Sequence, residues 1–124
     1  MQVYIDGNTE ERSSYNVIAK ICSTKNDAKD IIISAHMDSI YGVGADDNAS
    51  GVGAALELAK YYSSMSDVFN YNIIFVFFGA EEMGFLESKV YICEHAKELS
   101  NCIFVFNIDA IGGKDIFIES AGGV

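Results

Sequence analysis

The sequence predicts an α/β fold: a three-layer α/β/α domain in which helices cover both faces of a sheet, with residues 1–124 forming a single domain. Three observations predict it. Apolar runs typical of strands alternate with segments of helical periodicity, an order that favours a sheet covered by helices. Half of the residues are hydrophobic, which is enough for a buried core in 124 residues. Charged residues make up 21%, so the chain is not a disordered acidic tail.

The strands are predicted from apolar runs between polar, turn-rich stretches. Residues 30–35 (DIIISA) and 73–78 (IIFVFF) are apolar on both faces, as in buried parallel strands, and 73–78 suits a central position. Residues 15–22 (YNVIAKIC) predict an earlier strand, 103–111 (IFVFNIDAI) another buried strand, and 115–119 (DIFIE) a shorter one.

The helices are predicted between these strands. A loop at 41–51 (YGVGADDNASG) is rich in Gly, Asp and Asn, and Asn48 or Ser50 is a suitable N-cap for the helix that follows. That helix, at about 51–64, has apolar residues at helical spacing. A second helix is expected over 87–99.

Ionisable residues gather where the predicted strands end. Because ligand sites of α/β sheets lie at the carboxyl ends of the strands, these residues are the candidates for chemistry. They are His36 and Asp38 after the strand at 30–35, Asp46 and Asp47 in the next loop, Glu81 and Glu82 after 73–78, and Asp109 within 103–111.

Each of these groups also has an ordinary structural explanation. A single histidine such as His36 is more often hydrogen-bonded than a ligand, and adjacent acids commonly begin helices, where the helix dipole favours them. Asp109 is harder to explain in this way, because an acid within an apolar run needs a partner. Together, one imidazole and several carboxylates form a hard ligand set without thiolates, which suits Zn²⁺ and, less well, Mn²⁺ or Co²⁺.

Four of these stretches resemble the M28 family of zinc aminopeptidases. They are SAHMDS, GADDNASG, FFGAEEMGFLES and FNIDAIG, in the family's order, and YNVIAKI resembles the strand that opens the family's core. The resemblance covers nearly the whole chain from about Tyr15 onward. It implies the phosphorylase/hydrolase-like core of a di-zinc exopeptidase, which removes N-terminal residues from peptides. The sheet of such a core is expected to be mixed and mostly parallel.

The resemblance also implies the metal ligands. His36 and Asp109 would bind one zinc, Glu82 would bind the other, and Asp46 would bridge the two. The family's cis peptide bond is expected between Asp46 and Asp47.

Two further roles follow from the same resemblance. Glu81 would be the general base and acid, taking a proton from water and giving it to the leaving amine. Asp38 would orient His36. The substrate is expected to be a peptide with a free N-terminus, because an acidic site suits an ammonium group.

One ligand of the family is not found here. The family's second histidine follows the NIDAIG-type strand, whereas the other histidine of this chain, His95, lies in a predicted helix and is expected at the surface. We therefore expect a partial domain, lacking the family's N-terminal helices and C-terminal part. It should bind one zinc better than two and have weak activity or none.

Alternatives remain open within and outside enzymes. A glutaminyl-cyclase-like or carboxypeptidase-like relative would share the scaffold. A non-catalytic module would keep the fold without the metals, although the intact acidic motifs disfavour it. A plain α/β domain with purely structural acids is the remaining alternative.

Composition limits the partners. The net charge of −10 excludes a basic nucleic-acid surface, and no apolar run approaches the ~20 residues of a membrane span. Uncovered sheet edges in a partial domain would favour a homo-oligomer. The three scattered cysteines favour the cytoplasm, whereas a signal peptide upstream would make the protein extracellular.

Overall fold

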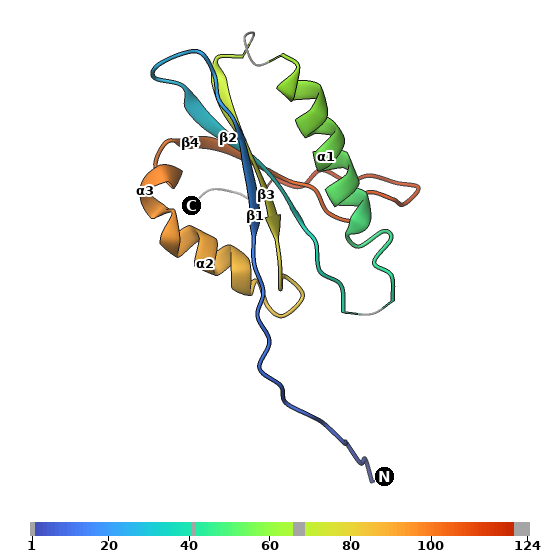
Figure 1. Cartoon of the computed structure of the whole chain (residues 1–124). Coiled ribbons are helices and arrows are strands. Elements are labelled where there is room, and N and C mark those ends of the chain that lie inside the picture. Colours follow the sequence, from blue (N-terminus) through green and yellow to red (C-terminus); the bar gives the residue numbers. More distant parts are fainter. Residues whose placement is uncertain (1, 41, 66–68, 121–124) are drawn as a thin grey trace.

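The computed structural model describes residues 2–40, 42–65 and 69–120. A four-stranded sheet lies between α1 on one face and α2 with α3 on the other, so the three-layer α/β/α prediction is confirmed (Figure 1). The strands are β1 (Val17–Ile21), β2 (Lys29–His36), β3 (Tyr71–Phe78) and β4 (Cys102–Asn107), and the helices are α1 (Ala49–Ser63), α2 (Leu86–Glu94) and α3 (Ala96–Leu99).

The sheet is mixed, with the strand order β1-β3-β2-β4. β2 pairs in parallel with both β3 and β4, whereas β1 runs antiparallel to β3. β3 is therefore an inner strand, as predicted from its continuous apolar run. The carboxyl ends of β2, β3 and β4 meet at the same edge of the sheet, the edge at which the ionisable motifs were expected.

Alternating residues of β2 and β3 fill two apolar cores. Ile33 and Phe75 face α1 and pack around Ala55, whereas Ile32 and Val76 face the other helices and pack with Tyr91. This period of two explains why the strands are apolar throughout: both of their faces are covered.

A buried ionic network ties the opposite edge of the sheet together. Asp30 of β2 is 3% exposed, and its carboxylate accepts hydrogen bonds from Lys20 at 3.1 Å, Asn72 at 2.7 Å and Asn101 at 3.2 Å. Burial alone would raise the pKa of Asp30. The hydrogen bonds from Asn72, Asn101 and Lys20, with the charge of Lys20, outweigh it and lower that pKa below its usual value.

Several predicted elements differ from the structure. The helix expected over 87–99 is divided at His95, whose backbone leaves helical geometry between α2 and α3. The strand expected at 103–111 ends at Asn107, and most of it is exposed rather than buried. In the sheet that the described residues form, β4 lies at the edge beside β2. Residues 115–119 form no strand, and Ile116, Phe117 and Ile118 are all exposed.

The first helix was predicted well. α1 starts at Ala49, and Asn48 is its N-cap, with a side-chain oxygen that accepts a hydrogen bond from the Gly51 amide. Tyr41, the first residue of the predicted loop, lies outside the described residues. Among the helices that the structure describes, none is long and apolar enough to span a bilayer.

Candidate metal centre

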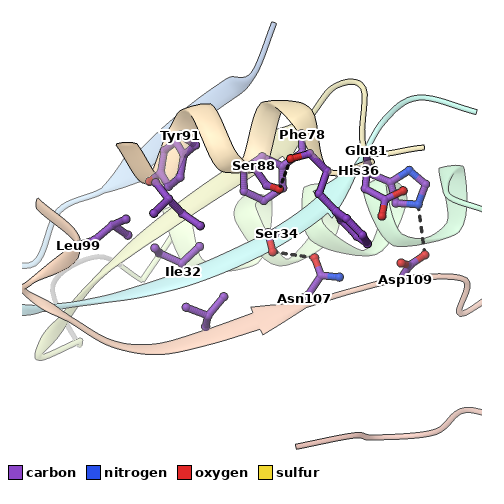
Figure 2. Close-up of a pocket in the computed structure, with 13 residues that line it drawn as sticks. Ile32, Ser34, His36, Phe78, Glu81, Ser88, Tyr91, Leu99, Asn107 and Asp109 are labelled. Atoms are coloured by element: carbon purple, nitrogen blue, oxygen red, sulfur yellow. Dashed lines mark hydrogen bonds and ion pairs between the residues drawn. The ribbon is translucent and has the colours of Figure 1, made fainter. Parts of the chain in front are cut away.

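His36 lies at the centre of the candidate site. It is the last residue of β2 and is 3% exposed, so its imidazole is held inside the fold. Its Nε2 lies 2.8 Å from Oδ1 of Asp47 and 3.3 Å from Oδ1 of Asp109. Figure 2 shows the ring directed toward Asp109, with Glu81 beside it. The nitrogen that most often binds metals thus already faces carboxylate oxygens.

The other ring nitrogen of His36 faces Asp38. Nδ1 lies 3.2 Å from the backbone oxygen of Asp38 and 3.5 Å from its carboxylate oxygen Oδ1. A hydrogen bond at Nδ1 fixes the tautomer that leaves Nε2 free to bind an ion. This geometry agrees with the expected orienting role of Asp38.

The structure brings Asp47, rather than Asp46, to the histidine. Asp46 has a different partner: its Oδ1 accepts a hydrogen bond from the Gly112 amide at 2.8 Å. The cis peptide bond lies between Asp47 and Asn48, so the prediction of a cis bond between Asp46 and Asp47 is wrong. The expected bridging position of Asp46 does not fit this geometry, because the carboxylate that lies against His36 Nε2 is the next one in the chain.

Asn48 holds the loops of Asp47 and Asp109 together. It is buried, and its Nδ2 donates to the Ile108 carbonyl at 2.9 Å. Its Oδ1, besides capping α1, accepts from the Ala110 amide at 3.1 Å. The Asn48 side chain thereby fixes the backbone on both sides of Asp109, and Asp47 is the residue directly before Asn48 in the chain. The sequence indicated Asn48 only as a helix cap, and this second role needed the tertiary structure.

Glu81 and Glu82 reach the site from the loop after β3. Both backbone amides donate to the Asp38 carboxylate, Glu81 to Oδ1 and Glu82 to Oδ2, each at 3.1 Å. Asp38 therefore contacts His36 and also anchors the acidic pair. The adjacent acids are partly buried, in contrast to the exposed Asp47 and Asp109.

The charges of the cluster perturb one another. Burial alone would lower the pKa of His36, but the carboxylates of Asp109, Glu81 and Asp47 outweigh it and raise that pKa above 6.5. Burial is the main factor that raises the pKa of Glu81 above 4.5. The neighbouring carboxylates of Glu82 and Asp109 add to it, and His36 opposes it. A carboxyl group with a raised pKa is better suited to move protons near neutral pH.

The donor atoms of the cluster fit a divalent cation. Among the described residues, two sets of possible ligands share the same imidazole: His36 with Asp47 and Asp109, and His36 with Glu81 and Glu82. Within each set, the ligand atoms all lie within 4.8 Å of one another. One nitrogen and several carboxylate oxygens match the preferences of zinc. Four of the expected residues, His36, Glu81, Glu82 and Asp109, are thus brought together. His95 belongs to neither set, and its ring packs against Tyr91 at the junction of α2 and α3.

A cavity of about 320 Å³ adjoins the cluster. His36, Glu81 and Asp109 line one end, and mostly apolar side chains of the sheet and α2, including Ile32 and Tyr91, line the rest (Figure 2). The imidazole and the carboxylates lie at the end where the ligand atoms converge, whereas Ser34, Ser88 and Asn107 add uncharged polar groups farther along the cavity. A bound molecule would thus have a polar end at the cluster and an apolar end beneath α2.

Comparison with known proteins finds similar peptidases. The model of peptidase family M28 matches residues 16–121. Aminopeptidase YwaD of Bacillus subtilis is 39% identical over 85 residues, which cover 66% of this chain and 18% of that protein. An aminopeptidase of Pseudomonas aeruginosa is 32% identical over 127 residues, covering 99% of this chain and 23% of that protein.

Solved structures show the same similarity. The aminopeptidase from Aneurinibacillus sp. strain AM-1 superposes with a TM-score of 0.72 and 37% identity, over 81% of this chain and 25% of that one. BSAP, a zinc aminopeptidase from Bacillus subtilis, gives a TM-score of 0.71 and 35% identity, over 78% and 24%. The chain thus spans about a quarter or less of each of these proteins.

Proposed function

Because the chain belongs to peptidase family M28, we propose that it forms the metal-binding core of a zinc-dependent aminopeptidase. The substrate would be a peptide with a free N-terminus. Aminopeptidases are prominent among the similar proteins, and one of the similar structures is described as a zinc enzyme.

The observation that carries the proposal is the convergence on His36. Carboxylates from three separate segments lie around one buried imidazole, with Asp47 and Asp109 at 2.8 and 3.3 Å from Nε2. So many acids beside one another repel unless a cation compensates them. If these acids only formed an exposed turn or began a helix, their carboxylates would not need to converge on one imidazole.

We assign the residues as follows. His36, Asp47 and Asp109 would hold one zinc, Asp47 would also face the second position, and Glu82 would bind there. When bound, zinc supplies a Lewis acid that lowers the pKa of water and polarises the scissile carbonyl. Asp38 orients His36 and holds the loop that carries Glu82.

Glu81 has the proton-transfer role. Its carboxylate would take a proton from the attacking water and deliver it to the leaving amine, which becomes the new N-terminus of the shortened peptide. Its raised pKa suits this exchange, because the group must be both an adequate base and an adequate acid. The surrounding carboxylates would also attract the ammonium group of the substrate.

The chain's two histidines allow a matched test of the metal site. Zinc affinity is measured by competition with a chromophoric chelator for the wild type, His36→Ala and His95→Ala. We expect His36→Ala to lose binding and His95→Ala to retain it. Equal affinities in all three proteins would contradict the proposal.

Activity is tested separately, on a leucine amide and on a peptide with N-terminal glutamine. Hydrolysis that requires zinc supports the peptidase, whereas cyclisation of the glutamine peptide would show a cyclase. We propose that the 124-residue chain binds one zinc more tightly than a second and turns over slowly at best. Two tightly bound ions per chain would contradict this part.

A further inference from the structure

The acidic pair lies on a short segment whose shape must be held from outside. We call residues 79–87, between β3 and the first turn of α2, the base loop. Ala80, Gly84 and Phe85 in it have positive φ angles, which non-glycine residues rarely adopt. The amides of Gly84 and Phe85 both donate to the Glu81 carbonyl, at 2.9 and 2.7 Å. The base loop is therefore a tight turn with a backbone path that its own residues disfavour.

One side chain joins the two ends of the base loop. Asn16, just before β1, accepts a hydrogen bond from the Gly79 amide through Oδ1 at 3.3 Å. Its Nδ2 donates to the Glu87 carbonyl at 3.0 Å. These partners are 63 and 71 residues away in the sequence, so the contact is made only by the fold. Asn16 is partly buried, which protects both bonds from competing water.

The backbone around Asn16 also fits closely against the start of the base loop. Gly79 is buried, and a Cβ atom at this position would lie 2.7 Å from the Tyr15 carbonyl oxygen. Any larger residue would push the segment before β1 away from the base loop. The close approach keeps the Asn16 amide within reach of Gly79 and Glu87.

We infer that Asn16 is a positioning residue for the acidic pair, an inference that rests on the proposed function. Asp38 holds the middle of the base loop through the amides of Glu81 and Glu82, and Asn16 holds its two ends. Asn16 belongs to neither set of possible ligand atoms, so it acts through the position of Glu82 and Glu81.

The two partners of Asn16 match the two ends of a carboxamide. The Gly79 amide needs an acceptor and the Glu87 carbonyl needs a donor, and the carboxamide of Asn16 offers both in one planar group. An aspartate would accept from Gly79 but would place a carboxylate against the Glu87 carbonyl. Asn16→Asp is therefore a nearly isosteric variant that loses one bond and keeps the other.

The test is a thermodynamic cycle on the affinity of the second zinc position, at which Glu82 would bind, titrated once the tighter position is filled. Asn16→Ala and Asn16→Asp are each made in the wild type and in a Glu82→Gln background. We expect Asn16→Ala to weaken zinc binding about tenfold, as for the loss of one or two hydrogen bonds, and Asn16→Asp to weaken it less. In the Glu82→Gln background, Asn16→Ala should have no further effect, because the ligand that it positions is already lost.

Asn72→Ala is the matched control for general destabilisation. Asn72 also makes hydrogen bonds within the sheet, but it contacts Asp30, far along β2 from His36. It should lower thermal stability with little effect on zinc affinity. The inference is overturned if Asn16→Ala leaves zinc affinity unchanged, if it weakens binding equally in the Glu82→Gln background, or if Asn72→Ala weakens it as much.

Hydrogen exchange separates this inference from the proposed function. Without added metal, Asn16→Ala should accelerate exchange of the Glu81 and Glu82 amides at least tenfold relative to the amides of β2. A wild type that binds no zinc would refute the proposed function, and unchanged exchange of the base loop would still refute the role of Asn16. Should Asn16→Ala fail to fold, Asn16→Asp, which retains the bond to Gly79, gives the same comparison.

Discussion

Asp46 and Asp47 are neighbours with the same side chain, and the structure gives them different roles. Asp47 lies 2.8 Å from His36 Nε2, whereas Asp46 accepts a hydrogen bond from Gly112. The substitutions Asp46→Asn and Asp47→Asn preserve shape and remove one negative charge each. Long-range electrostatic effects on a cation are therefore matched, and only the local contacts differ.

The expected magnitudes follow from these contacts. Asparagine at 46 still offers an oxygen to the Gly112 amide. The expected loss of zinc affinity is therefore the difference between a charged and a neutral hydrogen bond, about 1 kcal/mol or fivefold. Residues that hydrogen-bond to a metal ligand typically change metal affinity by about 10–100-fold when they are substituted. Loss of a direct carboxylate ligand at 47 should exceed that range, and we expect a reduction of more than about 100-fold.

The assay is a competitive zinc titration of the wild type and both variants at about pH 7.5, where carboxylates are ionised. Far-ultraviolet circular dichroism verifies folding. Cobalt provides a second readout, because its visible absorption reports the ligands around the ion. Asp47→Asn should change that spectrum and Asp46→Asn should not. Equal losses in the two variants, or a larger loss for Asp46→Asn, would refute the assignment of Asp47 and restore Asp46 as the ligand.

Three further predictions concern charge and pH. Glu81→Gln should leave zinc affinity within about tenfold of the wild type, as measured by zinc titration. The same variant should abolish hydrolysis of a leucine amide in any active form that contains this chain. Normal turnover of the variant would exclude Glu81 as the base. Zinc affinity should fall as the pH decreases through the pKa of His36, which the carboxylates raise above 6.5, because protons compete for Nε2. Histidine titrates roughly between pH 5 and 8. A zinc affinity that does not change over this range would contradict the ligand role of His36. Asp30→Asn should destabilise the fold by about 2 kcal/mol in urea unfolding at neutral pH. Because the pKa of Asp30 is lowered on folding, its contribution is present above the unfolded pKa and disappears as the pH falls through the native one, so the difference between wild type and variant should shrink in acid.

The sequence by itself determined the layered fold and the region of the site. The runs DIIISA and IIFVFF are apolar on both faces because helices cover both sides of β2 and β3. Parallel strands bring their carboxyl ends to one edge, so His36, Glu81 and Glu82 were predictable as neighbours from their positions after those strands. The N-cap at Asn48 was likewise a local signal.

Tertiary structure alone decided what depends on contacts between distant segments. Two adjacent aspartates are equivalent in a sequence, and the choice of Asp47 follows from the Asp46 bond to Gly112, 66 residues away. Asn16 is equally unremarked in the sequence, because its partners lie at the ends of a loop beyond β3. The exposure of β4 depends on which strands pair beside it. Apolar patterning is local and can be read along the chain, whereas the direction of one carboxylate depends on a few hydrogen bonds that form only after the chain has folded.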